Sequence, residues 1–267
     1  MSTVAFFSAK GAPGATTAAM LVASLWPRPA LLVDADPAGG DIALRLPSPE
    51  GRPLDQSTGM LSLLPLARRA ITGEQVLAHA QRVLGGGEVI AGLSGPEQAT
   101  AAGPVWAALI DVLRDVDDRD VMIDLGRLSV GSAVLPMAAR ADLAVLVTRD
   151  TVSGVVAARA RLRALVPALT DAQGAGPQLG LIVQGDSDRE ANSAASVIRG
   201  EFPRVQDYGR LAWDPVGVRM FDGEHVGRPE RSLIVRSGRE IVTAVDGALY
   251  GIELLRNERR GEKQEPR

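Results

Sequence analysis

The sequence has 267 residues and a net charge of −3, and 46% of its residues are hydrophobic while only 3% are aromatic. A core of Ala, Val, Leu and Ile in a chain of this length predicts one large α/β unit with helices layered on a parallel sheet. The absence of cysteine excludes a disulfide scaffold and Cys-based metal or redox chemistry, and it favours a reducing cytoplasm.

The first half of the chain alternates apolar strands with helices. Residues 3–8 are predicted to form a buried strand, followed by a glycine-containing loop and an Ala-rich helix. Further strands are predicted over 30–36 and 120–126, and both end in aspartate. Between them, residues 57–118 are predicted to form helices and loops around a short strand near 88–91.

The second half continues the same alternation. A strand is predicted from Asp142, an Ala/Arg-rich helix over 152–166, a surface loop over 167–177 and another strand over 178–184. Strands that alternate with helices imply right-handed crossovers. The predicted fold class is therefore α/β, a mostly parallel central sheet flanked by helices on both faces.

A final helix is predicted over 232–256, because apolar residues recur there at mostly helical spacing. Residues 257–267 are charged and are predicted to be a frayed, disordered tail. No repeat or long linker interrupts the chain, so we expect a single domain over 1–256.

The loop after the first strand carries the most specific signal. Backbone N–H groups that lead into a helix N-terminus favour bound phosphate. The ordinary Walker A pattern, G-x-x-x-x-G-K-[ST], is not satisfied, because Ala9 replaces its first glycine and Ala15 its lysine. A tight turn without a ligand is the alternative interpretation. The residues that favour a phosphate loop are Lys10, Gly11, Gly14, Thr16 and Thr17.

The stretch KGAPGATT resembles the deviant Walker A motif, K-G-G-x-G-K-[ST]-T, of the ParA/MinD family of P-loop ATPases, with Lys10 on the signature lysine. In that family the signature lysine reaches the partner's phosphates across a nucleotide-bound dimer, and the second lysine holds the β/γ-phosphates of its own subunit. Without that second lysine, ATP affinity is expected to fall by roughly one to two decades, with hydrolysis slow or absent. The resemblance implies that ATP contacts Lys10, Gly11, Ala12, Pro13, Gly14, Ala15, Thr16 and Thr17.

Acidic residues at the strand ends strengthen the resemblance. Asp34 and Asp36 in VDADPAGG resemble the family's D-x-D-P segment, and Asp124 matches the Walker B aspartate. The resemblance implies that Asp36 orients the attacking water and is catalytic together with Lys10. It also implies that Mg²⁺ is held by Thr16 and Asp124, with Asp34 supporting its shell. Taken singly, each aspartate could instead be a helix cap or turn residue.

Other stretches resemble the family more weakly. DADPAGGDIALRL and DLGRL at 124–128 are similar to segments of the CpaE/TadZ branch, ParA-like proteins that position pilus and secretion machinery. WDPVGVRM at 213–220 resembles the adenine-side I-P-x-D-P stretch, which implies base-side contacts from Asp214 and Pro215. Gln184 lies where many members carry a base-contacting Asn.

These observations predict an ATP-dependent, dimerising switch that positions a cellular cargo. Its partners would be a second copy in a homodimer and a protein of a partitioning, division or secretion/pilus complex. The alternative is a non-catalytic scaffold that dimerises without nucleotide. Another P-loop or Rossmann-type enzyme is disfavoured, because no G-x-G-x-x-G follows a strand and no Ser or Cys nucleophile motif occurs.

Surface features say less about partners. The arginines of 159–163 and 228–239 could bind DNA phosphates nonspecifically, although solvated helix faces are the commoner explanation. We interpret Trp213 as a packing residue. The chain lacks a basic leader and any apolar run near the roughly 18 residues of a spanning helix, so no transmembrane segment is expected. A cytoplasmic protein that reaches the membrane or the nucleoid through partners is predicted.

Overall fold

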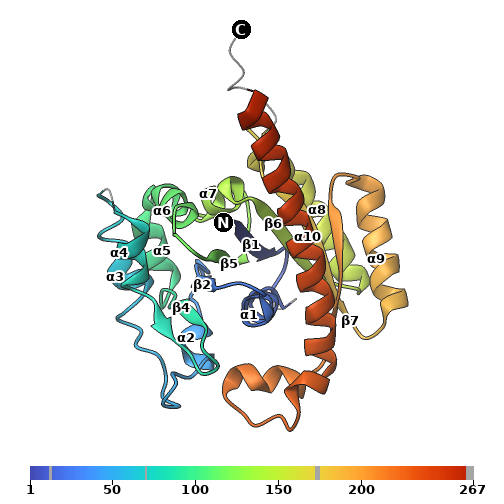
Figure 1. Cartoon of the computed structure of the whole chain (residues 1–267). Helices are drawn as coiled ribbons and strands as arrows, with labels where there is room; N and C mark the ends of the chain where they lie inside the picture. Colours follow the sequence, from blue (N-terminus) through green and yellow to red (C-terminus); the bar gives the residue numbers. More distant parts are fainter. Residues whose placement is uncertain (12–13, 70, 172–174, 263–267) are drawn as a thin grey trace.

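The computed structural model describes residues 1–11, 14–69, 71–171 and 175–262. Within these ranges an eight-stranded sheet has the order β3-β4-β2-β5-β1-β6-β7-β8 (Figure 1). All neighbouring strands are parallel except the pair β3 and β4. The strands are β1 Thr3–Ser8, β2 Ala30–Asp34, β3 Gln81–Arg82, β4 Glu88–Ile90, β5 Asp120–Arg127, β6 Leu143–Arg149, β7 Gln178–Gly185 and β8 Gln206–Ala212.

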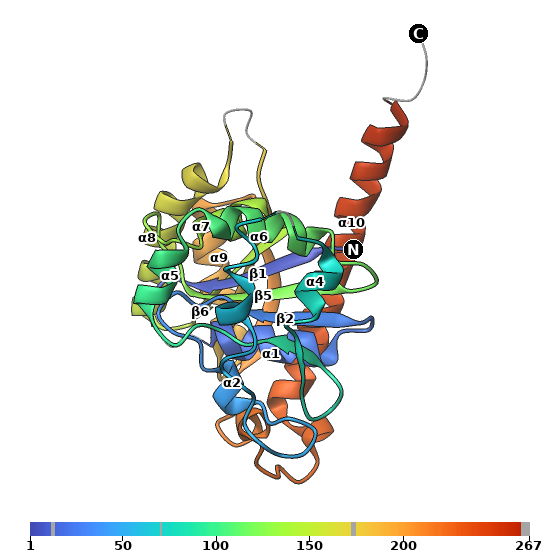
Figure 2. The same cartoon turned by 90° about the vertical axis from the view of Figure 1, so that its left-hand side faces the viewer.

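Helices cover both faces of the sheet, which confirms the predicted fold class (Figure 2). The α-helices are α1 Ala15–Leu25, α2 Ile42–Arg45, α3 Met60–Leu63, α4 Gly73–Leu77, α5 Pro96–Ala102, α6 Val105–Arg114, α7 Leu135–Arg140, α8 Val152–Leu169, α9 Asp188–Glu201 and α10 Leu233–Glu262. Two short 3-10 helices, η1 Gly217–Asp222 and η2 Pro229–Arg231, precede α10.

Two apolar cores result from the alternation of side chains along each strand. On β1, Ala5 and Phe7 face a core shared with α3 to α9, whereas Val4 and Phe6 face a core shared with α1, α2 and α10. Central strands buried on both faces need continuous apolar sequence, which is why β1, β5 and β6 were recognisable.

Several element boundaries differ from the expectations. Helix α8 continues through Pro167 to Leu169, so the predicted loop begins three residues later. Helix α10 continues to Glu262 rather than ending at residue 256, and its last turns extend beyond the rest of the molecule in both views. No helix in the described ranges is long and apolar enough to cross a membrane.

Helix α9 and strand β8 were not predicted, although α9 carries a local signal. Its N-cap Ser187 accepts a hydrogen bond from the Glu190 N–H, and the Ser187 hydroxyl donates to the Glu190 side chain. A serine followed three residues later by glutamate is a common helix start. The stretch SDRE therefore held enough information to place the beginning of α9.

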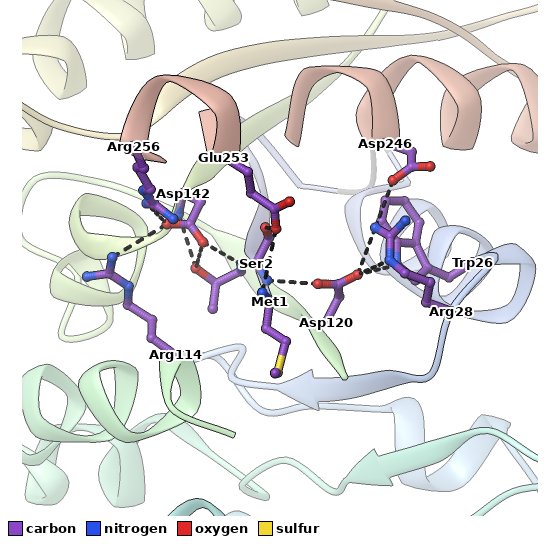
Figure 3. Close-up of polar contacts among 11 residues, drawn as sticks. Met1, Ser2, Trp26, Arg28, Arg114, Asp120, Asp142, Asp246, Glu253 and Arg256 are labelled. Atoms are coloured by element: carbon purple, nitrogen blue, oxygen red, sulfur yellow. Dashed lines mark hydrogen bonds and ion pairs between the residues drawn. The ribbon is translucent and has the colours of Figure 1, made fainter. Parts of the chain in front are cut away.

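Buried Asp120 organises the amino-terminal edge of the sheet (Figure 3). Its Oδ1 accepts the Ser2 N–H at 2.8 Å, and its Oδ2 accepts Trp26 Nε1 at 2.8 Å and Arg28 Nε at 3.0 Å. Arg28 also pairs with Asp246 of α10 at 2.7 Å. One carboxylate thereby connects β1, the end of α1 and, through Arg28, the long carboxyl-terminal helix.

Asp142 has a similar role beside it (Figure 3). Its Oδ2 accepts the Thr3 N–H at 2.8 Å, while its Oδ1 pairs with Arg114 at 3.6 Å and with Arg256 of α10. Because both buried carboxylates are provided with donors, the desolvation of their charge is offset. The second half of α10 is held to the sheet by these polar contacts as well as by apolar packing.

Replacing Gly247 of α10 with alanine should raise the free energy of unfolding by roughly 0.5–1 kcal/mol, because glycine weakens a helix interior relative to alanine. A Cβ added there meets nothing within 4 Å, so no clash opposes the gain. Urea denaturation of the purified protein would measure the change. Gly238→Ala is the matched control: its Cβ would lie 2.6 Å from Leu21 Cδ2, so this variant should be destabilised. Equal destabilisation by both substitutions would contradict the prediction.

Candidate functional site

A cavity of about 600 Å³ opens at the carboxyl ends of the strands. Its lining comes from the ends of β1, β5, β7 and β8, from the start of α1, and from the segment between β2 and α2. Open parallel sheets bind ligands at this edge. If the residues predicted from the sequence form a binding site, they should therefore line this cavity.

The glycine loop and the first turn of α1 form one wall. Gly11, Gly14, Thr16 and Thr17 line the cavity, whereas Ala12 and Pro13 lie outside the described residues. Gly14 has the left-handed φ of 85°, and a Cβ there would lie 2.7 Å from Gln184 Nε2. Both the backbone conformation and the close approach of β7 require glycine at this position. The backbone turns at Gly14 into the N-terminus of an eleven-residue helix.

Ala15 lines the same wall but is buried against the core beneath α1. Its methyl group supplies neither charge nor reach where a P-loop protein would extend a lysine. Lys10 is exposed and does not line the cavity, and it forms no hydrogen bond or ion pair within the described part of the chain. The signature position therefore carries an exposed cation that is unpaired among the described residues and is not part of the cavity lining.

Asp34 lies beneath the cavity rather than on its surface. Its side chain is completely buried, and its two oxygens accept the N–H groups of Asp36 and Ile42, each at 3.3 Å. Gly40 and Gly92 pack directly on the carboxylate, and a Cβ on Gly92 would lie 2.6 Å from Asp34 Cγ. Burial, followed by the charge of Asp124, raises the pKa of Asp34 well above its usual value.

Asp124 lies opposite Asp34 in the pairing of β2 with β5 and is also buried. It accepts the Gly126 N–H at 2.9 Å and a hydrogen bond from the Thr16 side chain. Burial raises the pKa of Asp124 to about 6, and these two hydrogen bonds oppose the shift. A hydroxyl on the cavity wall is thus backed by a buried carboxylate.

This pair fits a hydrated magnesium ion, because Mg²⁺ binds through few protein oxygens and keeps several waters. Thr16 could contact such an ion directly, and Asp124 could hold it from behind. Asp34 has both oxygens occupied by backbone N–H groups and is covered by glycine. Within the described ranges no cluster of three or more acidic or histidine side chains forms a metal cage.

Asp36 lines the cavity itself. It accepts the Ala38 N–H at 2.8 Å and faces Gly126, where a Cβ would overlap its carboxylate. Partial burial raises the pKa of Asp36, the Ala38 hydrogen bond opposes this, and the charge of Asp41 adds to the rise. Among the three aspartates predicted at the ends of β2 and β5, Asp36 is therefore the one that lines the cavity, whereas Asp34 and Asp124 are buried.

The opposite wall comes from the ends of β7 and β8. Gln184 is buried, and its Oε1 has no hydrogen-bond partner among the described residues. Asp214 and Pro215 also line this wall, but the Asp214 carboxylate accepts the N–H groups of Gly217 at 2.8 Å and Ile234 at 3.3 Å. Asp214 thereby shapes the wall and the start of α10, while Gln184 offers a free acceptor.

The interpretation of Trp213 as a packing residue was wrong. Its side chain is 43% exposed and lines the cavity, and the Arg149 guanidinium lies 4.7 Å from the centre of its ring. Trp213 directly follows β8, the last strand, so its side chain lies at the cavity instead of in the core. Strand β8 was not predicted, so only the resemblance of WDPVGVRM to an adenine-side stretch indicated that this segment lies near the site.

The arginine run of α8 is not a free basic face. Arg159 and Arg163 both pair with Glu201 of α9, the former at 2.6 Å. Arg161 donates to the Ala9 carbonyl oxygen at 3.1 Å, so it supports the phosphate-loop segment from behind. Two cavity-lining arginines, Arg45 and Arg127, were quoted in the resembling stretches but not assigned a role.

No protein-family model matches the sequence, and no curated protein matches it. Solved structures do match over nearly the whole chain. A ParA family ATPase from Chlorobium tepidum TLS has a TM-score of 0.65 at 17% identity and covers 93% of this chain and 97% of its own. The cell division ATPase MinD from Pyrococcus furiosus has a TM-score of 0.67 at 20% identity, with coverages of 92% and 98%.

A third match is a plasmid partition protein from Borrelia burgdorferi B31, whose structure contains AMPPNP. Its TM-score is 0.65 at 14% identity, and it covers 91% of this chain and 97% of its own. A parallel sheet whose first strand leads through a glycine loop into α1 defines the class as a P-loop-type α/β protein. More particularly, the chain has the fold of the ParA and MinD ATPases. The finer CpaE/TadZ assignment stays a prediction.

Proposed function

We propose that this protein is a ParA/MinD-like, nucleotide-binding switch that dimerises with ATP and positions a cellular cargo. The supporting observation is the cavity that brings the glycine loop, Thr16 backed by Asp124, and Asp36 to one edge of a ParA/MinD fold. The fold alone would be compatible with many activities. The convergence of these groups in one cavity favours nucleoside triphosphate.

In this proposal the triphosphate lies along the glycine loop, where backbone N–H groups and the dipole of α1 favour anions. Thr16 and Asp124 would hold Mg²⁺, and the buried Asp34 would support that site from beneath the cavity. The ion would supply positive charge that neutralises the phosphates. Asp36 orients the attacking water, since it lines the cavity while the neighbouring Asp34 and Asp124 are buried. The purine lies toward Gln184, Asp214 and Pro215.

Lys10 would act on a partner subunit. It is exposed and unpaired among the described residues, and it lies at the start of the loop. A lysine in this state is available to a phosphate of a second copy across a dimer interface, as the resemblance implies. Ala15 removes one phosphate contact within each subunit, so hydrolysis is expected to be slow or absent.

The cargo belongs to a partitioning, division, secretion or pilus complex in this proposal. The similar structures include a ParA family ATPase, cell-division MinD proteins and a MinC:MinD complex from Aquifex aeolicus. A cytoplasmic switch would reach the membrane or nucleoid through such partners. Nonspecific DNA contact is confined to the second arginine run, where Arg228, Arg231, Arg236 and Arg239 are exposed.

The alternative function is a scaffold that dimerises and recruits partners without nucleotide. The buried methyl group of Ala15 favours the scaffold, because the side chain at the position that would contact phosphate packs in the apolar core instead. The two functions predict opposite responses of self-association to nucleotide.

The test is sedimentation velocity with and without Mg-ATP, together with calorimetric binding of ATP and ADP. We expect Mg-ATP to convert the native protein to a dimer, and Lys10→Ala and Asp36→Ala to abolish that nucleotide-induced association. Lys263→Ala is a matched control, because Lys10 and Lys263 are the only lysines in the sequence. Association that is independent of nucleotide and unchanged in both variants would establish the scaffold instead.

A further inference from the structure

The candidate site lacks the lysine that usually neutralises part of the charge of a bound triphosphate. Ala15 is neutral and buried, and Lys10 does not line the cavity. Among the described lining residues, two side chains are cationic, Arg45 and Arg127. Any phosphate charge that is neutralised within one subunit must therefore be met by one of them, by magnesium or by backbone N–H groups.

Arg45 already forms an ion pair with a carboxylate. Its Nε donates to Asp222 Oδ1 at 2.9 Å, and its side chain is only 20% exposed. This ion pair connects α2 with η1. Arg45 would have to give up that partner to bind a phosphate.

Arg127 has no such partner. Its side chain is exposed, lines the cavity, and forms no ion pair or hydrogen bond within the described ranges. It pairs in register with Ser8, which is the last residue of β1 and lies directly before the glycine-loop segment. The free guanidinium therefore originates next to the base of the loop.

A β-bulge places it there. The pairing of β1 with β5 passes from Phe6 opposite Asp124 to Ser8 opposite Arg127, so β5 contains one extra residue. Gly126 has a φ of 54° at this point, a left-handed conformation that glycine adopts readily. Bulges change the direction of the side chains that follow them and often occur beside functional sites.

A second guanidinium lies near the same loop. Arg161 of α8 donates to the Ala9 carbonyl oxygen at 3.1 Å, and burial followed by the positive charge of Arg127 lowers the pKa of Arg161. The two positive charges repel each other, and an anion bound by Arg127 would offset that repulsion. The local charge therefore favours an anion on the Arg127 side of the loop.

We propose that Arg127 supplies the phosphate-binding charge that Ala15 lacks, and that it binds the β- and γ-phosphates of the nucleoside triphosphate. A guanidinium suits this role because its planar donors can contact two phosphate oxygens together. The charge would reach the phosphates from the end of β5 instead of from the first turn of α1. This inference rests on the proposed nucleotide site.

The test is calorimetric binding of Mg-ATP, Mg-ADP and AMP to the native chain and to Arg127→Ala. Loss of a charge-assisted phosphate contact should weaken Mg-ATP binding roughly ten- to a hundredfold. The loss should be smaller for Mg-ADP and absent for AMP. Arg199→Ala removes an exposed arginine of α9 that does not line the cavity, so it should leave all three affinities unchanged.

A double-mutant cycle tests directly whether Arg127 replaces the lysine that is missing at position 15. Ala15→Lys should restore Mg-ATP binding to Arg127→Ala, and Arg127→Ala should cost several-fold less in the Ala15→Lys background than in the native one. Thermal melts of each variant would show that the fold persists. Additive effects in the cycle would contradict the inference.

The remaining outcomes are separable. Native protein that binds Mg-ATP with an affinity unaffected by Arg127→Ala overturns the role of Arg127 and leaves the nucleotide site standing. A larger loss in Arg45→Ala than in Arg127→Ala assigns the contact to Arg45 and likewise overturns the inference. Native protein that binds no nucleotide overturns both the inference and the proposed function.

Discussion

Replacing Asp120 with alanine is expected to lower the free energy of unfolding by about 3 kcal/mol, because two buried donors would lose their acceptor. The Ser2 N–H and Trp26 Nε1 both donate to this carboxylate at 2.8 Å. Alanine can accept neither hydrogen bond, and the Asp120 side chain that it replaces is only 5% exposed. Urea denaturation at neutral pH would measure the loss.

Asp246→Ala is the matched control for this prediction. It removes the ion pair with Arg28, whose side chain is 49% exposed, and exposed pairs contribute about 0–1 kcal/mol. Asp120→Asn keeps one acceptor oxygen and should lie between the two. If Asp120→Ala were no more destabilising than Asp246→Ala, the amino-terminal edge would not depend on the buried carboxylate.

Replacing Asp124 with asparagine is expected to raise the free energy of unfolding by about 2–3 kcal/mol at pH 8. Burial raises the pKa of Asp124 to about 6 in the folded protein, against an ordinary value of 3.8. Between these pH values the folded state binds more protons than the unfolded state, so native stability falls as pH rises through about 6. Asparagine removes the charge and also the repulsion with Asp34.

The pH dependence distinguishes this effect from a simple packing change. The gain from Asp124→Asn should shrink to well under 1 kcal/mol near pH 4, where the native carboxyl is protonated and the unfolded one half protonated. The Thr16 hydroxyl can reverse its role and accept from the amide, so asparagine can keep the hydrogen bond to Thr16. Exposed Asp117→Asn carries the same charge change and should alter stability by less than about 0.5 kcal/mol. An equal gain at pH 4 and pH 8 would contradict the prediction.

Buried carboxylates thus have opposite effects at the two ends of the strands. At the amino-terminal edge, Asp120 and Asp142 each meet several donors and fasten the chain ends to the sheet. At the carboxyl edge, Asp34 and Asp124 face each other across β2 and β5 with fewer donors. An arrangement that costs stability in the free protein is expected where a cation would later relieve it.

Much of the fold was predictable from sequence because its signals are local. Apolar runs buried on both faces identified β1, β2, β5, β6 and β7, and the short strand at Glu88–Ile90 followed its glycine turn. Strand β8 was missed because its sequence, QDYGRLA, lacks such a run. Its place at the sheet edge, paired with β7 alone, tolerates a less apolar strand.

The sequence by itself determined that Thr16, Asp36 and Gln184 lie at one end of the sheet, because each lies near the carboxyl end of a predicted strand and parallel strands bring those ends together. Asp214 was assigned to the site only through the resemblance, since the strand before it was not predicted. Tertiary structure alone decided which of the neighbouring acids faces the cavity and which lies sealed beneath glycine. It also decided that Arg127 lines the cavity without a partner among the described residues, while Arg45 is paired with Asp222. These outcomes depend on a bulge and on packing between segments far apart in the chain, and no local pattern encodes such contacts.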